Sequence, residues 1–130
     1  ILPTLDFTET RFIANVSGST IEEYAEVTRR FDDSPIDAIE INISCPNVKE
    51  GGVAFGNYPE MSARVVAACR AVTKKPLITK LSPNQTDIRE NARMCIEAGT
   101  DGLAVINTVM GMAIDAKTRR PVIGNVQGGL

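Results

Sequence analysis

Short apolar runs alternate along the chain with longer segments that carry the start and stop signals of helices. The short runs are rich in isoleucine, valine and leucine, a composition that favours strands. The longer segments begin with residues that commonly cap a helix. The predicted strands cover residues 12–16, 38–44, 76–81 and 102–106.

Three helices are predicted between these strands. Each begins where a side chain that can accept a hydrogen bond from the first turn precedes the helical segment. The predicted caps are Ser19 with Glu22, Asn57 with Glu60 and Pro59, and Thr86. The helices are expected to end near residues 31, 72 and 98, with Gly99 following the last one.

Two further segments are rich in turn residues. The glycine-rich stretch of residues 45–56 is predicted to be a long loop, and loops of that length inside compact domains commonly bind ligands. Residues 112–123 contain two short extended runs around Lys117 and Thr118, which predicts a hairpin.

Strands that alternate with helices predict a parallel sheet with right-handed crossovers. Two α/β architectures have that order, an open doubly wound sheet and part of a closed barrel. No GxGxxG sequence follows the first strand, which weighs against a dinucleotide-binding doubly wound sheet. A complete (β/α)8 barrel needs about 250 residues. The chain has 130, so it is either a smaller complete fold or a piece of a larger one.

Polar side chains stand where each predicted strand ends, at positions that a plain hydrophobic layer would not use. The carboxyl ends of parallel strands share one rim, where ligands bind in such folds. Amides both donate and accept hydrogen bonds and suit a planar heterocycle, whereas lysine suits an anionic ring or a carboxylate. The residues are Asn15 on the first strand, Asn42, Ser44 and Cys45 on the second, Lys80 and Ser82 on the third, and Asn107 and Thr108 on the fourth.

These residues also have structural interpretations. An asparagine at a strand end is often a turn residue, and Lys80 could extend its ammonium group to solvent. Cys45 could be a small buried apolar side chain, although its place before Pro46 and a glycine-rich loop favours a function. Cys69 and Cys95 lie on predicted helices, where packing is the expected role.

Composition argues against several kinds of partner and site. The net charge of −2 gives no electrostatic reason to expect nucleic acid or an anionic membrane. Three widely spaced cysteines without histidine predict neither a zinc site nor a disulfide framework, and a reducing cytoplasm is the expected location. No apolar run reaches the roughly 20 residues of a membrane span. Residues 1–7 do not resemble a signal peptide.

Several sequence stretches, in this order and spacing, resemble the class 1 dihydroorotate dehydrogenases, the FMN-dependent TIM-barrel enzymes of pyrimidine synthesis. The main stretch is residues 41–47, Ile-Asn-Ile-Ser-Cys-Pro-Asn. Residues 48–56 and 127–130 are most similar to the NAD-linked subclass 1B. The other stretches are residues 13–18, 79–84 and 106–111. The resemblance implies that residues 1–130 are one partial domain, about four consecutive βα units from the middle of the (β/α)8 barrel, without its N- and C-terminal parts.

The resemblance also implies roles for individual residues. Cys45 matches the active-site base, where the membrane-bound, quinone-dependent class 2 enzymes have serine. Asn42, Asn47, Asn107 and Thr108 match orotate contacts. Asn15, Asn42, Lys80 and Ile106 match FMN contacts. No metal ligand is implied.

The reaction that the resemblance implies begins when the Cys45 thiolate removes the C5 proton of dihydroorotate, and the hydride at C6 passes to FMN. Lys80 is expected to stabilise negative charge on the reduced flavin. In subclass 1B, a partner subunit with FAD and a 2Fe–2S cluster passes the electrons to NAD. A homodimer of barrels or a heterotetramer with two such partners is expected. Subclass 1A enzymes use fumarate, and that alternative stays open.

Two other interpretations stay open. Dihydropyrimidine dehydrogenase has a similar domain, but with histidine after its Ser-Cys-Pro and a cysteine in the glycine-rich loop. Here those positions are Asn47 and Phe55. A non-catalytic flavin- or phosphate-binding barrel would keep Asn15 and Lys80 but would not need Cys45.

Overall fold

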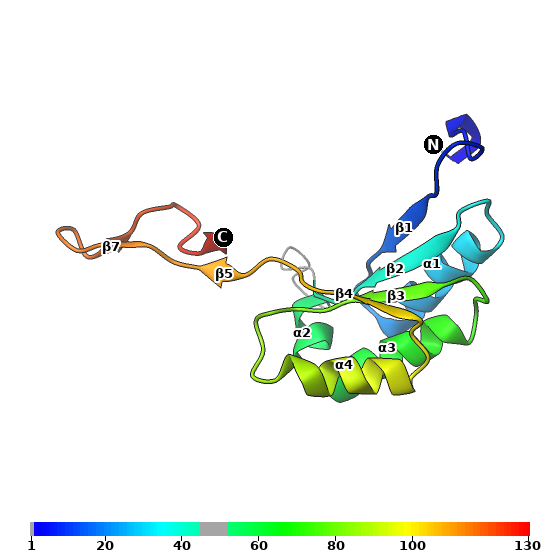
Figure 1. Cartoon of the computed structure of the whole chain (residues 1–130). Coiled ribbons are helices and arrows are strands. Elements are labelled where there is room, and N and C mark those ends of the chain that lie inside the picture. Colours follow the sequence, from blue (N-terminus) through cyan, green and yellow to red (C-terminus); the bar gives the residue numbers. More distant parts are fainter. Residues whose placement is uncertain (1, 45–51) are drawn as a thin grey trace.

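The computed structural model describes residues 2–44 and 52–130. Four parallel strands form one sheet in the order β1-β2-β3-β4. The helices α1, α3 and α4 lie on one side of this sheet (Figure 1). The strands are β1 Ile13–Val16, β2 Ala38–Asn42, β3 Leu77–Lys80 and β4 Gly102–Ala104, and the helices are α1 Ile21–Asp32, α3 Pro59–Arg70 and α4 Ile88–Glu97.

The order of the strands identifies the architecture. In a βα barrel, successive strands are neighbours and the helices all lie outside, whereas a doubly wound sheet reverses its order and has helices on both faces. The sheet therefore has the winding of consecutive barrel units, as predicted. The described strands form an open sheet with β1 and β4 at its edges.

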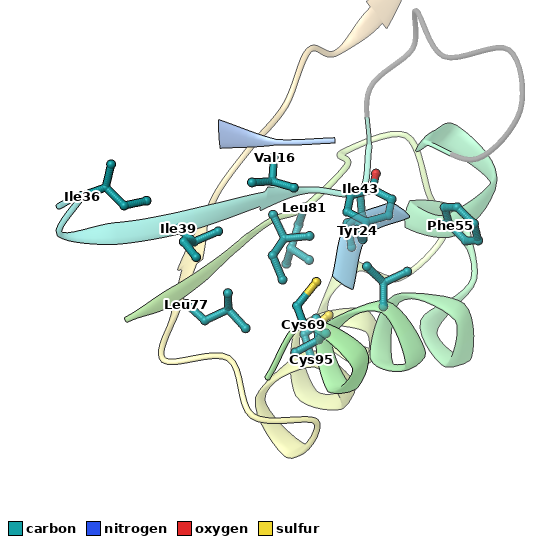
Figure 2. Packing of buried hydrophobic residues seen from close by; sticks show 13 residues of the cluster. Val16, Tyr24, Ile36, Ile39, Ile43, Phe55, Cys69, Leu77, Leu81 and Cys95 are labelled. Atoms are coloured by element: carbon teal, nitrogen blue, oxygen red, sulfur yellow. The ribbon is translucent and has the colours of Figure 1, made fainter. Parts of the chain in front are cut away.

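The core lies between the sheet and the helices (Figure 2). Side chains alternate between the two faces of a strand, so Ile39 and Ile41 of β2 and Leu77 of β3 point toward the helices. The side chains that meet them include Tyr24, Val65, Val66, Cys69 and Cys95. The prediction that Cys69 and Cys95 are packing residues is confirmed, since both are fully buried.

Two helices begin one residue later than predicted. Thr20, not Ser19, caps α1, because its side chain accepts a hydrogen bond from the Glu23 N–H at 3.1 Å. Asp87, not Thr86, caps α4 and accepts from the Arg89 N–H at 2.9 Å. In both cases two neighbouring side chains can cap the helix, and the second of the two does so from an extended backbone.

The glycine-rich segment is not entirely loop. Residues Gly52–Asn57 form the short helix α2, so Asn57 ends one helix rather than capping the next. The N-cap of α3 is Tyr58, whose side chain makes no capping hydrogen bond, while Pro59 stands in the first turn as predicted. Gly99 follows α4 with φ +104°, the left-handed conformation that its predicted place requires.

Beyond β4 the chain leaves the sheet as an extended arm, residues 105–130 (Figure 1). The strand β4 therefore ends at Ala104, two residues earlier than predicted. The strand β2 also ends two residues early, at Asn42. The predicted hairpin is confirmed by the antiparallel pair β6 Ile114–Asp115 and β7 Arg120–Pro121. A second pair, β5 Met110–Gly111 with β8 Gly128–Gly129, was not predicted. The remaining element is the short 3₁₀ helix η1 at Leu2–Thr4.

Candidate functional site

The sheet face opposite the helices, here called the open face, carries the polar side chains of the strands. Asn15, Glu40, Asn42 and Lys80 alternate with the core-facing residues and therefore point to this face. The register aligns Asn15 with Glu40, and Asn42 with Lys80, on neighbouring strands. Three residues predicted from the sequence thus share one face with Glu40, which had not been singled out.

Glu40 connects β1 to β3 through one carboxylate oxygen. The Nδ2 group of Asn15 donates to Oε1 of Glu40 at 2.5 Å, and the Lys80 Nζ lies 3.8 Å from the same oxygen. The side chains of Glu40 and Lys80 are 22% and 32% exposed, so their charges are partly shielded from water. Lys80 therefore forms a cluster with Asn15 and Glu40 on the open face and does not simply extend into solvent.

The carboxyl ends of the strands are joined by Asn107. Its Nδ2 group donates to the Asn42 Oδ1 at 3.1 Å and to the Ser44 Oγ at 2.8 Å. The Ser44 hydroxyl donates in turn to the main-chain oxygen of Lys80 at 3.2 Å. The ends of β2 and β3 and the segment after β4 thus form one hydrogen-bonded rim, as the parallel order predicted.

An open hollow of about 390 Å³ lies at this rim. Four of its lining residues are those for which the sequence predicted FMN or orotate contacts. The lining residues are Lys80, Ile106, Asn107, Thr108, Val109 and Leu130. A second hollow, of about 450 Å³, has Ile106 in common with it but is formed mainly by the segment that leads into α4. The predicted polar residues Lys80, Asn107 and Thr108 line the first hollow and not the second.

Asn84 fixes the backbone beside this hollow. Its Nδ2 donates to the Thr108 main-chain oxygen at 2.8 Å, and its Oδ1 accepts from the Met110 N–H at 3.0 Å. No local sequence pattern around Asn84 indicates this role. For Glu40 a signal existed, because a charged residue two positions before Asn42 in a strand must share its face.

Cys45 and Asn47 lie outside the described residues, so their assigned roles stay predictions. The residues on either side of that segment lie close together. Gly56 packs so tightly that an added Cβ would lie 2.6 Å from the main-chain oxygen of Ile43. The Nδ2 group of Asn91 donates to the Gly56 main-chain oxygen at 2.8 Å. Ser44, the last described residue before that segment, is itself part of the rim.

The two cysteines that the structure describes are not suited to act as a base. Burial raises the pKa of the Cys69 thiol and raises the pKa of Cys95 to about 12. Both thiols are therefore protonated near neutral pH. The proton abstraction expected from the sequence would need Cys45.

The donor set around the hollow fits a flavin better than a metal. Lys80 supplies a cation, Asn42 and Asn107 supply amides, and Ile106 and Val109 supply apolar surface for a planar ring. Within residues 2–44 and 52–130, no group of three or more acidic, cysteine or histidine side chains could hold a metal ion.

No helix in the same ranges has the length and apolar character needed to cross a bilayer.

Comparison with known proteins identifies close relatives. A family model described as dihydroorotate dehydrogenase matches residues 3–130. Three similar proteins carry the name dihydroorotate dehydrogenase B (NAD(+)), catalytic subunit. They come from Trichlorobacter lovleyi (58% identical over 130 residues), Pelobacter propionicus (55% over 130) and Exiguobacterium sibiricum (52% over 130). These matches cover 99% of this chain but only 42% to 43% of each relative, so the chain spans less than half of their length.

Proposed function

Because the chain belongs to the dihydroorotate dehydrogenase family, we propose that it is the central part of an FMN-dependent enzyme that oxidises dihydroorotate to orotate in pyrimidine biosynthesis. The observation that carries the proposal is the hollow at the carboxyl ends of the strands. Lys80, Ile106, Asn107 and Thr108 all line it. Residues 1–130 would then be one partial domain of a longer barrel.

The proposed FMN contacts are Asn15, Asn42, Lys80 and Ile106. A bound FMN would supply the acceptor for the hydride that leaves C6 of dihydroorotate. Lys80 would face the edge of the flavin ring where negative charge develops on reduction. The Asn15 amide and the Lys80 ammonium are both held by Glu40, which supports their placement on the open face.

The proposed orotate contacts are Asn42, Asn47, Asn107 and Thr108. Amide side chains can pair with the N–H and C=O groups of the pyrimidine ring. Hydrogen bonds from Asn107 to Asn42 and Ser44 hold these groups in place before substrate arrives. The Cys45 thiolate would take the C5 proton, and the electron pair left behind would form the C5=C6 double bond as hydride leaves C6.

The electron acceptor is proposed to be NAD, reached through a separate subunit that carries FAD and a 2Fe–2S cluster. The names of the relatives support this, since they specify NAD(+) and a catalytic subunit. A homodimer or a heterotetramer is the expected assembly. A cytoplasmic location is proposed on the basis of the buried free thiols of Cys69 and Cys95.

An anaerobic absorbance spectrum of the full-length protein, before and after addition of dihydroorotate, tests the function. We expect dihydroorotate to bleach a flavin band in the wild type and to leave it unchanged in Cys45→Ala, with the flavin still bound. Bleaching by dihydrouracil alone would move the protein to the pyrimidine reductases. A full-length protein that binds no flavin would contradict the proposal.

A further inference from the structure

Glu40 is the only acidic residue in the described strands β1 to β4. It stands between Ile39 and Ile41, which are both fully buried on the opposite face. A carboxylate in the middle of a sheet is costly unless charged or hydrogen-bonding partners compensate its lost hydration. Its position therefore calls for partners on the neighbouring strands.

Those partners are Asn15 on β1 and Lys80 on β3. Both meet the same oxygen, Oε1 of Glu40, at 2.5 Å from the Asn15 Nδ2 and 3.8 Å from the Lys80 Nζ. A lysine side chain has four flexible carbon–carbon bonds, and an anion beside its ammonium group restricts the positions that it can take. Lys80 also lines the hollow at the rim, so Glu40 restrains a group that faces the proposed ligand.

We propose that Glu40 is a positioning residue of the flavin site, which holds the Lys80 ammonium and the Asn15 amide at the open face and offsets the positive charge beside bound FMN. The inference rests on the proposed function, because the family resemblance is what assigns Asn15 and Lys80 to FMN. That resemblance assigns no role to Glu40.

The sign of the effect follows from charge. Reduction of the flavin adds negative charge to its ring, which Lys80 favours and Glu40 opposes. Loss of the Glu40 charge leaves Lys80 uncompensated, so the reduced flavin is stabilised and its midpoint potential becomes more positive. We expect a change on the order of tenfold in the equilibrium between oxidised and reduced flavin, or about 30 mV for a two-electron couple.

The test is a reductive titration of FMN bound to the full-length protein, with a chemical reductant and a reference dye instead of substrate. Glu40→Gln keeps the size of the side chain and an oxygen acceptor for Asn15 but removes the charge. We expect a more positive potential in Glu40→Gln and a more negative one in Lys80→Gln. Glu40→Asp keeps the charge one methylene further from Lys80 and should give a smaller positive shift.

Glu97→Gln is the matched control, because Glu97 forms an exposed ion pair with Arg93 on α4, outside the core and the rim. Its potential should equal that of the wild type. Equal potentials in wild type, Glu40→Gln and Glu40→Asp would overturn the inference, even if the variants were less stable. If Glu40→Gln does not fold, the shift in Glu40→Asp decides the question.

The proposed function is tested separately by adding dihydroorotate to the same samples. Bound FMN that dihydroorotate cannot reduce would contradict the function, while the potentials would still support or overturn the role of Glu40. A full-length protein that binds no added FMN would overturn both.

Discussion

The side-chain amide of Asn107 donates a hydrogen bond to the Ser44 hydroxyl at 2.8 Å, although the two residues are 63 positions apart in the chain. Ser44 immediately precedes Cys45, and Asn107 lies just beyond β4. This bond therefore links a proposed substrate contact to the start of the segment that carries the proposed base.

Replacement of Asn107 by alanine should weaken both binding and stability. It removes the donor to Asn42 and Ser44, so the free energy of unfolding should fall by about 1–3 kcal/mol. The Kd for orotate should rise on the order of tenfold, which corresponds to one lost hydrogen bond of about 1.4 kcal/mol. Flavin absorbance changes during an orotate titration of the full-length protein measure this. Asn125→Ala, in the exposed part of the arm, is the control. An unchanged Kd would contradict the assignment of Asn107.

Gly56→Ala should destabilise the protein, because the added Cβ would lie 2.6 Å from the main-chain oxygen of Ile43. Backbone atoms cannot move aside as a flexible side chain can, so a loss of about 1–3 kcal/mol is expected from overpacking. Chemical denaturation of the full-length protein measures it. Gly124→Ala is matched to it, since nothing lies within 4 Å of a Cβ there. Equal stability of the two variants would mean that Gly56 is not tightly packed.

Asp87 should give α4 a pH-dependent contribution to stability. Hydrogen bonds from the Arg89 side chain, and then from the Arg89 backbone N–H, lower the pKa of Asp87 from 3.8 to about 2. A lowered pKa in the folded state means that the contribution is complete above the ordinary pKa and is lost as pH falls toward 2. Asp87→Asn keeps a capping oxygen but lacks the charge.

Unfolding of wild type and Asp87→Asn in the full-length protein, followed from about pH 6 to pH 2.5, checks this. The difference in unfolding free energy should be constant at the upper end and shrink below about pH 4. Arg89→Gln should reduce the same pH-dependent difference, because the guanidinium group is its largest cause. A difference that does not vary with pH would show that the charge of Asp87 has no role in stability.

The rate of flavin reduction by dihydroorotate should increase with pH. The proposed base is the thiolate of Cys45, and an ordinary thiol, with a pKa of about 8.5, is mostly protonated at neutral pH. Anaerobic stopped-flow measurements between about pH 6 and pH 10 check this. In Cys45→Ser the hydroxyl ionises only at much higher pH, so the rate should be lower throughout. A rate independent of pH in the wild type would count against proton removal by Cys45 as the limiting step.

Local patterns were sufficient for the alternation of strands and helices. Ile39 and Ile41 in β2 and Leu77 in β3 are apolar because they lie on the strand face that is buried against the helices. This requirement does not depend on which side chains occupy the opposite face. Gly99 marks a helix end because few other residues adopt its φ of +104°. The choice between Ser19 and Thr20 as a cap was not determined locally, since both side chains can accept the same kind of hydrogen bond.

Local patterns were enough to predict the order of the elements and the polar residues at the strand ends, because each depends on neighbours within a few positions. The pairing of the strands is long-range, so the same patterns left an open sheet and part of a barrel as alternatives, and the strand order of the structure separates them. Which of those polar groups meet depends on how the whole chain folds. The oxygen of Glu40 that Asn15 and Lys80 share depends on the register of three strands, and the contact of Asn107 with Ser44 depends on how the chain leaves β4. Such contacts join residues that are 25 to 63 positions apart, and no local pattern records that distance.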